Sequence, residues 1–114
     1  MPNYIKNIVA EKALDLAALV SYNPGQIVSM TLAQNKAISI TIFAFAAGEE
    51  ISTHESHGDA LITALDGSAE ITIGSGIHTL KKGESILMPA AIPHAVKATE
   101  DYKMLLVVVF PVIS

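Results

Sequence analysis

The sequence predicts an all-β domain, and three observations support this prediction. From Gln26 onward, short apolar runs alternate with turn residues about every ten positions, which is the spacing of an antiparallel sandwich or barrel. The run "AISITIFAF" is rich in the β-branched and aromatic residues that favour strands. With 114 residues, two domains would each be too small to bury a core. We therefore expect one domain over residues 1–114, with an N-terminal extension (1–25) and a barrel (about 26–110).

Nine segments have the length and composition of strands. They are residues 26–32, 37–46, 51–54, 59–65, 68–73, 77–80, 85–88, 95–98 and 103–110. Residues 8–20, "IVAEKALDLAALV", are ambiguous, because Ala and Leu favour a helix whereas short apolar runs also suit a strand. We expect a short helix or helical turn there, with a structural role.

Turn residues separate these segments. Asp66-Gly67 lies between two predicted strands as a two-residue hairpin turn of type I′, in which both positions need a positive φ. The tripeptides Gly74-Ser75-Gly76 and Lys82-Gly83-Glu84 indicate the next two turns. The predicted strands are thus joined by short connections.

Composition excludes several classes of protein. The chain has no cysteine, which excludes disulfides, thiolate metal sites and thiol nucleophiles. The formal charge is −4 and the seven lysines are scattered, so we expect no nucleic-acid partner. No apolar run approaches the roughly 18 to 20 residues of a membrane span. Charged residues interrupt the first apolar stretch, unlike a secretory signal, so we expect a cytoplasmic protein.

Two spaced motifs identify a family resemblance. Gly48 is followed by five residues and His54, and a glycine closes the motif at Gly67. Gly83 is followed by five residues and Pro89, and His94 comes five positions after that proline. These spacings resemble the cupin motifs G-x5-H-x-H-x3,4-E-x6-G and G-x5-P-x-G-x2-H-x3-N. The resemblance covers roughly residues 48–98 and implies a double-stranded β-helix, or jelly-roll, of the small single-domain cupin 2 type.

Several positions depart from the family pattern. Ala60 occupies the position of the glutamate, and Ser56 that of the second histidine, with His57 one position later. In the second motif, Ala91 replaces the glycine and Ala98 replaces the asparagine. The carboxylate ligand of the family pattern is therefore absent.

The resemblance implies a histidine site at the mouth of the barrel, with His54, His57 and His94 as candidate metal ligands. Imidazole ligands suit Zn, Fe(II), Ni, Mn or Cu and do not choose among them. Two metal-free histidines that hydrogen-bond one another or water are the alternative. We expect a mostly apolar pocket, with these candidate lining residues: Phe43, Phe45, Ser56, Ala60, Ile62 and Met88.

The direction of His57 is open at this stage. Side chains alternate along a strand, so if His54 points inward, Ser56 also points inward and His57 points away. A bulge at Ser56–Gly58, which Gly58 would permit, would turn His57 into the site.

The cupin fold hosts many reactions, so it does not select one. Three functions stay open: a metal-binding cupin that binds or acts on a small, partly apolar molecule, a metal-free ligand-binding protein, and a structural dimer with a vestigial pocket. As an enzyme, the first would be a metal-dependent dioxygenase, isomerase or lyase. Because the hydrophobic share is 51%, with apolar residues concentrated in 8–20 and 105–113, we expect a homodimer built from the chain termini.

Overall fold

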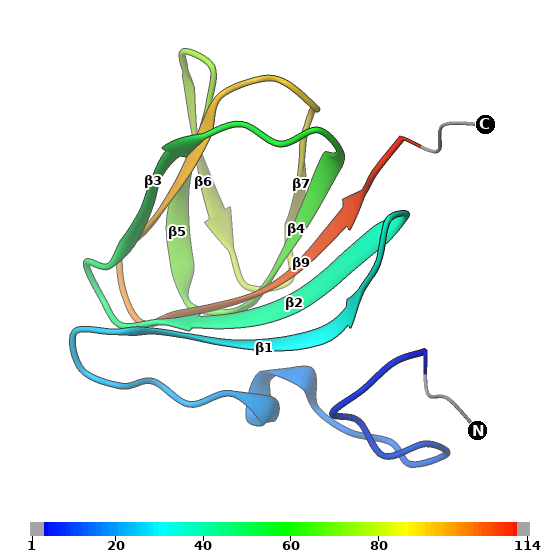
Figure 1. The fold of residues 1–114 in the computed structure, drawn as a ribbon. Coiled ribbons are helices and arrows are strands. Elements are labelled where there is room, and N and C mark those ends of the chain that lie inside the picture. The colour runs from blue at the N-terminus through cyan, green and yellow to red at the C-terminus, as the bar shows by residue number, and fades with distance from the viewer. Residues whose placement is uncertain (1–3, 112–114) are drawn as a thin grey trace.

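The computed structural model describes residues 4–111, which form two antiparallel sheets facing one interior (Figure 1). The strands are β1 (Ile27–Gln34), β2 (Ile38–Phe45), β3 (Glu50–His54), β4 (Asp59–Asp66), β5 (Ser68–Ile73), β6 (Gly76–Lys81), β7 (Ser85–Met88), β8 (His94–Ala98) and β9 (Tyr102–Val109). One sheet has the order β1-β2-β9-β4-β7 and the other the order β3-β8-β5-β6. The predicted all-β jelly-roll is confirmed.

All nine predicted strands are present, and their ends differ from the predicted ends by no more than two residues. The ambiguous segment 8–20 contains one turn of 3-10 helix, η1 (Leu16–Leu19). The carboxylate of Asp15 caps this turn by accepting a hydrogen bond from the backbone N–H of Ala17 at 3.0 Å. Among residues 4–111, no helix has the length and hydropathy needed to cross a bilayer.

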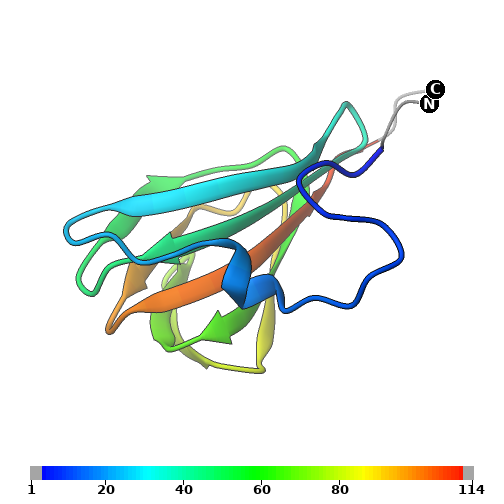
Figure 2. The same cartoon turned by 90° about the horizontal axis from the view of Figure 1, so that it is seen from below.

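The N-terminal extension packs against the outer face of the five-stranded sheet (Figures 1 and 2). Val20 is buried against Ile42 and Ala44 of β2, and Leu16 and Leu19 of η1 cover the same cluster. Alternate side chains of β2 thus face two different cores, because Phe43 and Phe45 point to the barrel interior. This second contact explains why β2 is apolar on both faces.

Polar contacts hold the extension in place. Lys103 on β9 donates a hydrogen bond from Nζ to the carbonyl oxygen of Ala17 at 2.6 Å. The same ammonium lies 4.9 Å from the ring centroid of Tyr22, within cation–π range. The hydroxyl of Tyr22 donates to the carboxylate of Asp66, and partial burial together with this carboxylate raises the pKa of Tyr22.

The predicted hairpin at Asp66-Gly67 is wrong. Strand β4 pairs with β7 and β9, and β5 pairs with β6 and β8, so the chain crosses from one sheet to the other at Gly67. Gly67 has φ +67°, as predicted, but Asp66 has no positive φ, which a type I′ turn requires. A Cβ at residue 67 would also overlap the backbone carbonyl of Asp101. Glycine is needed here for a crossing that passes close to another loop.

The next turn is a hairpin, because β5 and β6 pair directly and Ile73 lies opposite Gly76. Gly74 supplies the positive φ, at +58°.

Because the chain passes close to Asp101 at Gly67, we predict that Gly67→Ala destabilises the protein much more than the same substitution at another glycine of similar φ. Gly25 has φ +69° and open space where its Cβ would lie. We expect Gly25→Ala to cost about 1 kcal/mol of unfolding free energy, from the backbone conformation alone. Gly67→Ala should cost more than about 3 kcal/mol, because the clash with Asp101 adds to that strain. Urea denaturation of the two variants checks this, and equal midpoints would contradict the close approach.

Candidate functional site

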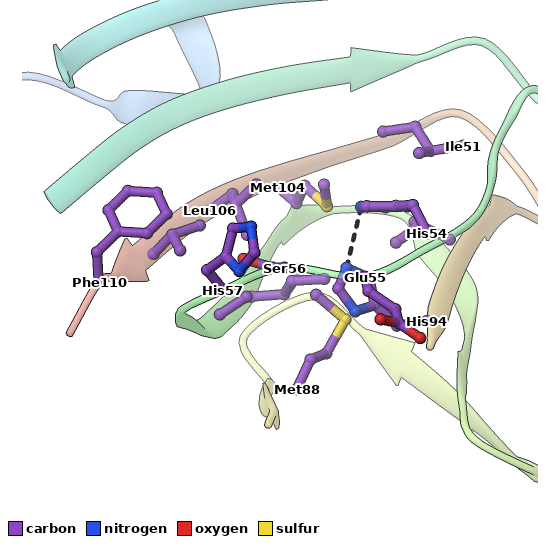
Figure 3. Close-up of a pocket in the computed structure, with 14 residues that line it drawn as sticks. Ile51, His54, Glu55, Ser56, His57, Met88, His94, Met104, Leu106 and Phe110 are labelled. Atoms are coloured by element: carbon purple, nitrogen blue, oxygen red, sulfur yellow. Dashed lines mark hydrogen bonds between the residues drawn. The ribbon is translucent and has the colours of Figure 1, made fainter. Parts of the chain in front are cut away.

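A cavity of about 300 Å³ opens between the two sheets (Figure 3). Both sheets contribute to its wall, with β3 and β8 on one side and β4, β7 and β9 on the other. Its lining residues are Ile51, His54, Glu55, Ser56, His57, Ala60, Ile62, Met88, His94, Val96, Met104, Leu106, Val108 and Phe110. All three histidines predicted for the site therefore line one pocket.

His54 and His94 lie in direct contact. His54 ends β3 and His94 begins β8, and the two are cross-strand partners. Their Nε2 atoms are 3.0 Å apart, and the ring planes meet edge to face at 71°. His94 is buried, with 3% of its surface exposed, whereas His54 is exposed at the mouth.

Backbone carbonyls orient both rings. Nδ1 of His54 lies 2.9 Å from the carbonyl oxygen of Ser52, and Nδ1 of His94 lies 3.2 Å from that of Ile92. A carbonyl oxygen only accepts, so each Nδ1 must donate its hydrogen. In a neutral imidazole the other nitrogen is then a bare acceptor. With both neutral rings in this tautomer, the two Nε2 atoms would both be acceptors facing each other in the cavity.

Burial disfavours protonation of His94, the buried histidine of the pair. Burial lowers the pKa of His94 below its usual 6.5, because the imidazolium loses hydration. The carbonyl of Ile92 opposes this shift, and the neighbouring His54 lowers the pKa further. His94 is thus a neutral nitrogen donor near neutral pH.

His57 lies in the loop between β3 and β4 rather than on a strand. Strand β3 ends at His54, so alternation along the strand does not decide the direction of His57. The irregularity in the ladder lies between Ile51 and His54, not at the predicted position Ser56–Gly58. His57 lines the cavity (Figure 3), but within residues 4–111 no three His, Cys, Asp or Glu side chains converge as metal ligands.

Two loops brace each other at the pocket rim. The backbone N–H of Ala91 donates to the carbonyl oxygen of Ser56 at 2.9 Å, and that of Ala90 donates to the carboxylate of Asp59 at 2.8 Å. Ala91, at the family's glycine position, has φ +64°, which costs an alanine roughly 1 kcal/mol. The contacts with the β3–β4 loop hold this conformation.

The structure places the six residues expected in the wall in two groups. Ser56, Ala60, Ile62 and Met88 line the cavity. Phe43 and Phe45 also point into the barrel, but they belong to its packed core. There Phe45 lies 6.0 Å from the ring of Phe43 and 5.6 Å from that of Tyr102. These rings fill the part of the interior that the pocket does not reach.

Sequence reasoning missed the contribution of β9. Met104, Leu106 and Val108 share its inward face and line the cavity, followed by Phe110. The apolar character of residues 105–113 predicts a subunit interface, whereas the structure places part of this segment in the cavity wall. Alternation along the strand was the available clue, since residues 104, 106 and 108 must share one face.

The histidine pair fits two ligands of one metal ion. Two nitrogens at about 2.1 Å from an ion, and about 90° apart, lie about 3.0 Å from each other. The Nε2 atoms of His54 and His94 have that separation. A carbonyl that accepts from the remote ring nitrogen is the usual outer partner of a ligating histidine. The donor set present is therefore two imidazoles.

Comparison with known proteins supports the family assignment. The cupin domain model matches residues 41–110. A conserved protein of unknown function from Streptococcus pyogenes is 46% identical, with a TM-score of 0.95 and 98% of both chains covered. A cupin superfamily protein from Desulfitobacterium hafniense DCB-2 is 34% identical, with a TM-score of 0.90, covering 94% of this chain and 98% of that one.

A cupin 2 conserved barrel domain protein from Leptotrichia buccalis is 43% identical, with a TM-score of 0.82. The match covers 84% of this chain and 47% of that longer one. No curated protein matches the chain. The paired motifs, the jelly-roll topology and these similarities agree, and the chain belongs to the cupin domain family.

Proposed function

We propose that this protein is a metal-binding cupin that holds a transition-metal ion through His54 and His94 and binds a small, largely apolar molecule beside it. One observation carries the proposal: the two Nε2 atoms lie 3.0 Å apart while both Nδ1 atoms lie within hydrogen-bond distance of carbonyl oxygens. If both Nδ1 atoms donate to those carbonyls, neither Nε2 of a neutral pair carries a hydrogen, and a metal ion bound by both nitrogens would relieve the repulsion of their lone pairs. Burial keeps His94 neutral, which is the form in which an imidazole ligates a metal ion.

The cavity limits the molecule that could bind. Its volume of about 300 Å³ is at the small end of ligand pockets. Most of its wall is aliphatic or thioether, and none of the lining residues is a lysine. A ligand with an apolar body and one oxygen-bearing head group suits this wall, with the head group directed to the histidines.

Two histidines and an apolar wall are the protein groups that would determine the chemistry at the site. A bound ion would polarise an oxygen atom of the ligand as a Lewis acid. His54 and His94 would hold the ion, and the apolar wall would exclude water from the ligand body. The fold alone does not choose among dioxygenase, isomerase and lyase reactions, or simple binding.

We predict that His54→Ala and His94→Ala each lower metal affinity by at least about tenfold, because each removes one of two adjacent donors. His57→Ala should cause a smaller loss, since His57 is not joined to the pair in a three-ligand group within residues 4–111. Elemental analysis and titration with Zn, Ni, Mn, Cu and Fe ions measure these effects.

His78→Ala is the matched control, because His78 is an exposed histidine on β6 outside the cavity. A loss with His57→Ala as large as that with His94→Ala would make His57 a third ligand. If no ion binds the unaltered protein, the metal proposal fails. A metal-free ligand-binding protein then becomes the better interpretation.

The pH dependence of metal binding follows from His94. Its pKa is lowered below the usual 6.5, so the ring is mostly neutral at pH 6.5 and becomes protonated at lower pH. We therefore expect metal affinity to change little between pH 8 and about 6.5, and to fall below that range. Competition with a chelator at each pH measures this. A decline already evident between pH 8 and 7 would contradict the neutral donor.

We also propose that two copies associate through the outer face of β4 and β7. Leu61 and Leu87 are cross-strand partners on this face and are 42% and 54% exposed, and Val109 at the end of β9 is 56% exposed. Within the segment 8–20, Ile8, Leu16, Leu19 and Val20 cover the chain's own sheet instead, so these apolar side chains are not available to a partner. An exposed apolar patch of this kind is typical of an association surface.

Sedimentation at micromolar concentration should show a dimer, and Leu87→Lys should shift it toward a monomer, because a charge would be buried in the interface. Ile77→Lys is the control, since Ile77 is 66% exposed on the other sheet. A monomer in the unaltered protein would refute the interface.

A further inference from the structure

His57 is a polar side chain of the cavity that the proposed metal site does not use. It lines the pocket, but it forms no three-ligand group with the other histidines in the part of the chain that the structure describes. Figure 3 shows it apart from the His54–His94 pair, on the side of the cavity toward Leu106 and Phe110. Among the described residues, no hydrogen bond to protein engages its ring nitrogens, so both are free to contact a bound molecule.

The loop between β3 and β4 holds His57 against the end of β9. Gly58 directly follows His57 and is buried, and a Cβ at that position would overlap the backbone carbonyl of Val109. The hydroxyl of Ser56 accepts a hydrogen bond from the N–H of Gly58 at 3.2 Å, and the carbonyl oxygen of Ser56 accepts one from the N–H of Ala91 at 2.9 Å. The backbone is therefore held on both sides of His57.

The three histidines of the cavity thus lie against opposite sheets. His54 and His94 belong to β3 and β8 of the four-stranded sheet, whereas the loop that carries His57 packs against β9 of the five-stranded sheet. Most of the remaining wall is aliphatic or thioether. A molecule that fills the cavity can therefore meet an imidazole on both sides, with its apolar body against the wall.

On the basis of the proposed function, we infer that His57 binds the ligand directly, through a hydrogen bond to a neutral hydroxyl that the ligand carries in addition to its head group. A neutral imidazole has one nitrogen that donates and one that accepts, so it pairs with a hydroxyl in either direction. The ligand class is then a short hydroxy acid or a close analogue. Its oxygen head group lies at the His54–His94 pair and its hydroxyl at His57.

Charge favours a hydroxyl over a second carboxylate in this position. Glu55 lies two positions before His57 and also lines the cavity at its exposed mouth, and the lining contains no lysine. A ligand carboxylate at His57 would therefore be added beside a like charge, with no lysine to offset it. A hydroxyl keeps the hydrogen bond and avoids this repulsion.

Three matched series of unbranched acids, each of about four to six carbons, test the second contact. The series are plain carboxylic acids, acids with a terminal hydroxyl, and dicarboxylic acids. Protein saturated with the tightest-binding of the Zn, Ni, Mn, Cu and Fe ions is titrated with each acid by calorimetry. At the best chain length, we expect the hydroxy acid to bind at least about threefold more tightly than the plain acid, because one hydrogen bond is added. The dicarboxylic acid should show no such gain.

Two variants separate the hydrogen bond from packing. His57→Phe keeps an aromatic ring but has no ring nitrogen, so it should abolish the gain while the affinity for the plain acid stays within about twofold. His78→Ala, at an exposed histidine on β6 outside the cavity, should keep the full gain. In NMR spectra of the unaltered protein, the ring signals of His57 should move more with the hydroxy acid than with the plain acid.

A gain that survives in His57→Phe, or no gain at any chain length, would overturn the role of His57 and leave the metal site standing. A dicarboxylic acid that gains as much as the hydroxy acid would overturn the neutral hydroxyl. If no ion binds the unaltered protein, or if no acid of any series binds the loaded protein, the proposed function itself fails along with this inference.

Discussion

Strand β9 imposes the constraint on which the rest of the structure depends. It pairs along its whole length with β2 on one side and β4 on the other, so its side chains must alternate between two environments. The inward set, Tyr102, Met104, Leu106 and Val108, builds the core and the pocket wall. The outward set begins with Lys103, which holds the N-terminal extension through Ala17 and Tyr22. A one-residue slip of this strand would exchange the two sets and abolish both the pocket and the anchor.

The site depends on a second constraint, the backbone carbonyls that engage the remote nitrogens of the two imidazoles. Without the carbonyls of Ser52 and Ile92, one ring could donate from Nε2 and the pair would be an ordinary hydrogen bond. With both Nδ1 atoms donating to these carbonyls, the two Nε2 atoms of a neutral pair are free of hydrogen. Cross-strand pairing of β3 with β8 sets their spacing, so the fold itself brings the two nitrogens together.

Departures from the family motifs give a less charged site. Ala60 removes the carboxylate, and the side chain opposite Ala60 on β7 is the apolar Met88. Ala91 replaces the glycine of the second motif but keeps a positive φ, so its backbone is strained. Its N–H still reaches Ser56, so the loop that carries His57 stays braced against the loop before His94.

Local patterns in the sequence determined the nine strands, the single helical turn, the positive φ at Gly67 and the presence of three histidines around one pocket. These features depend on alternation, turn residues and motif spacing, which act over a few neighbouring positions. Only the tertiary structure decided which strands pair, because pairing joins residues far apart in the chain. It therefore turned the expected hairpin at Gly67 into a crossing between sheets and moved Phe45 from the pocket to the core. The same pairing set the two Nε2 atoms face to face and brought the inward side chains of β9 into the wall of their pocket, which no local pattern could specify.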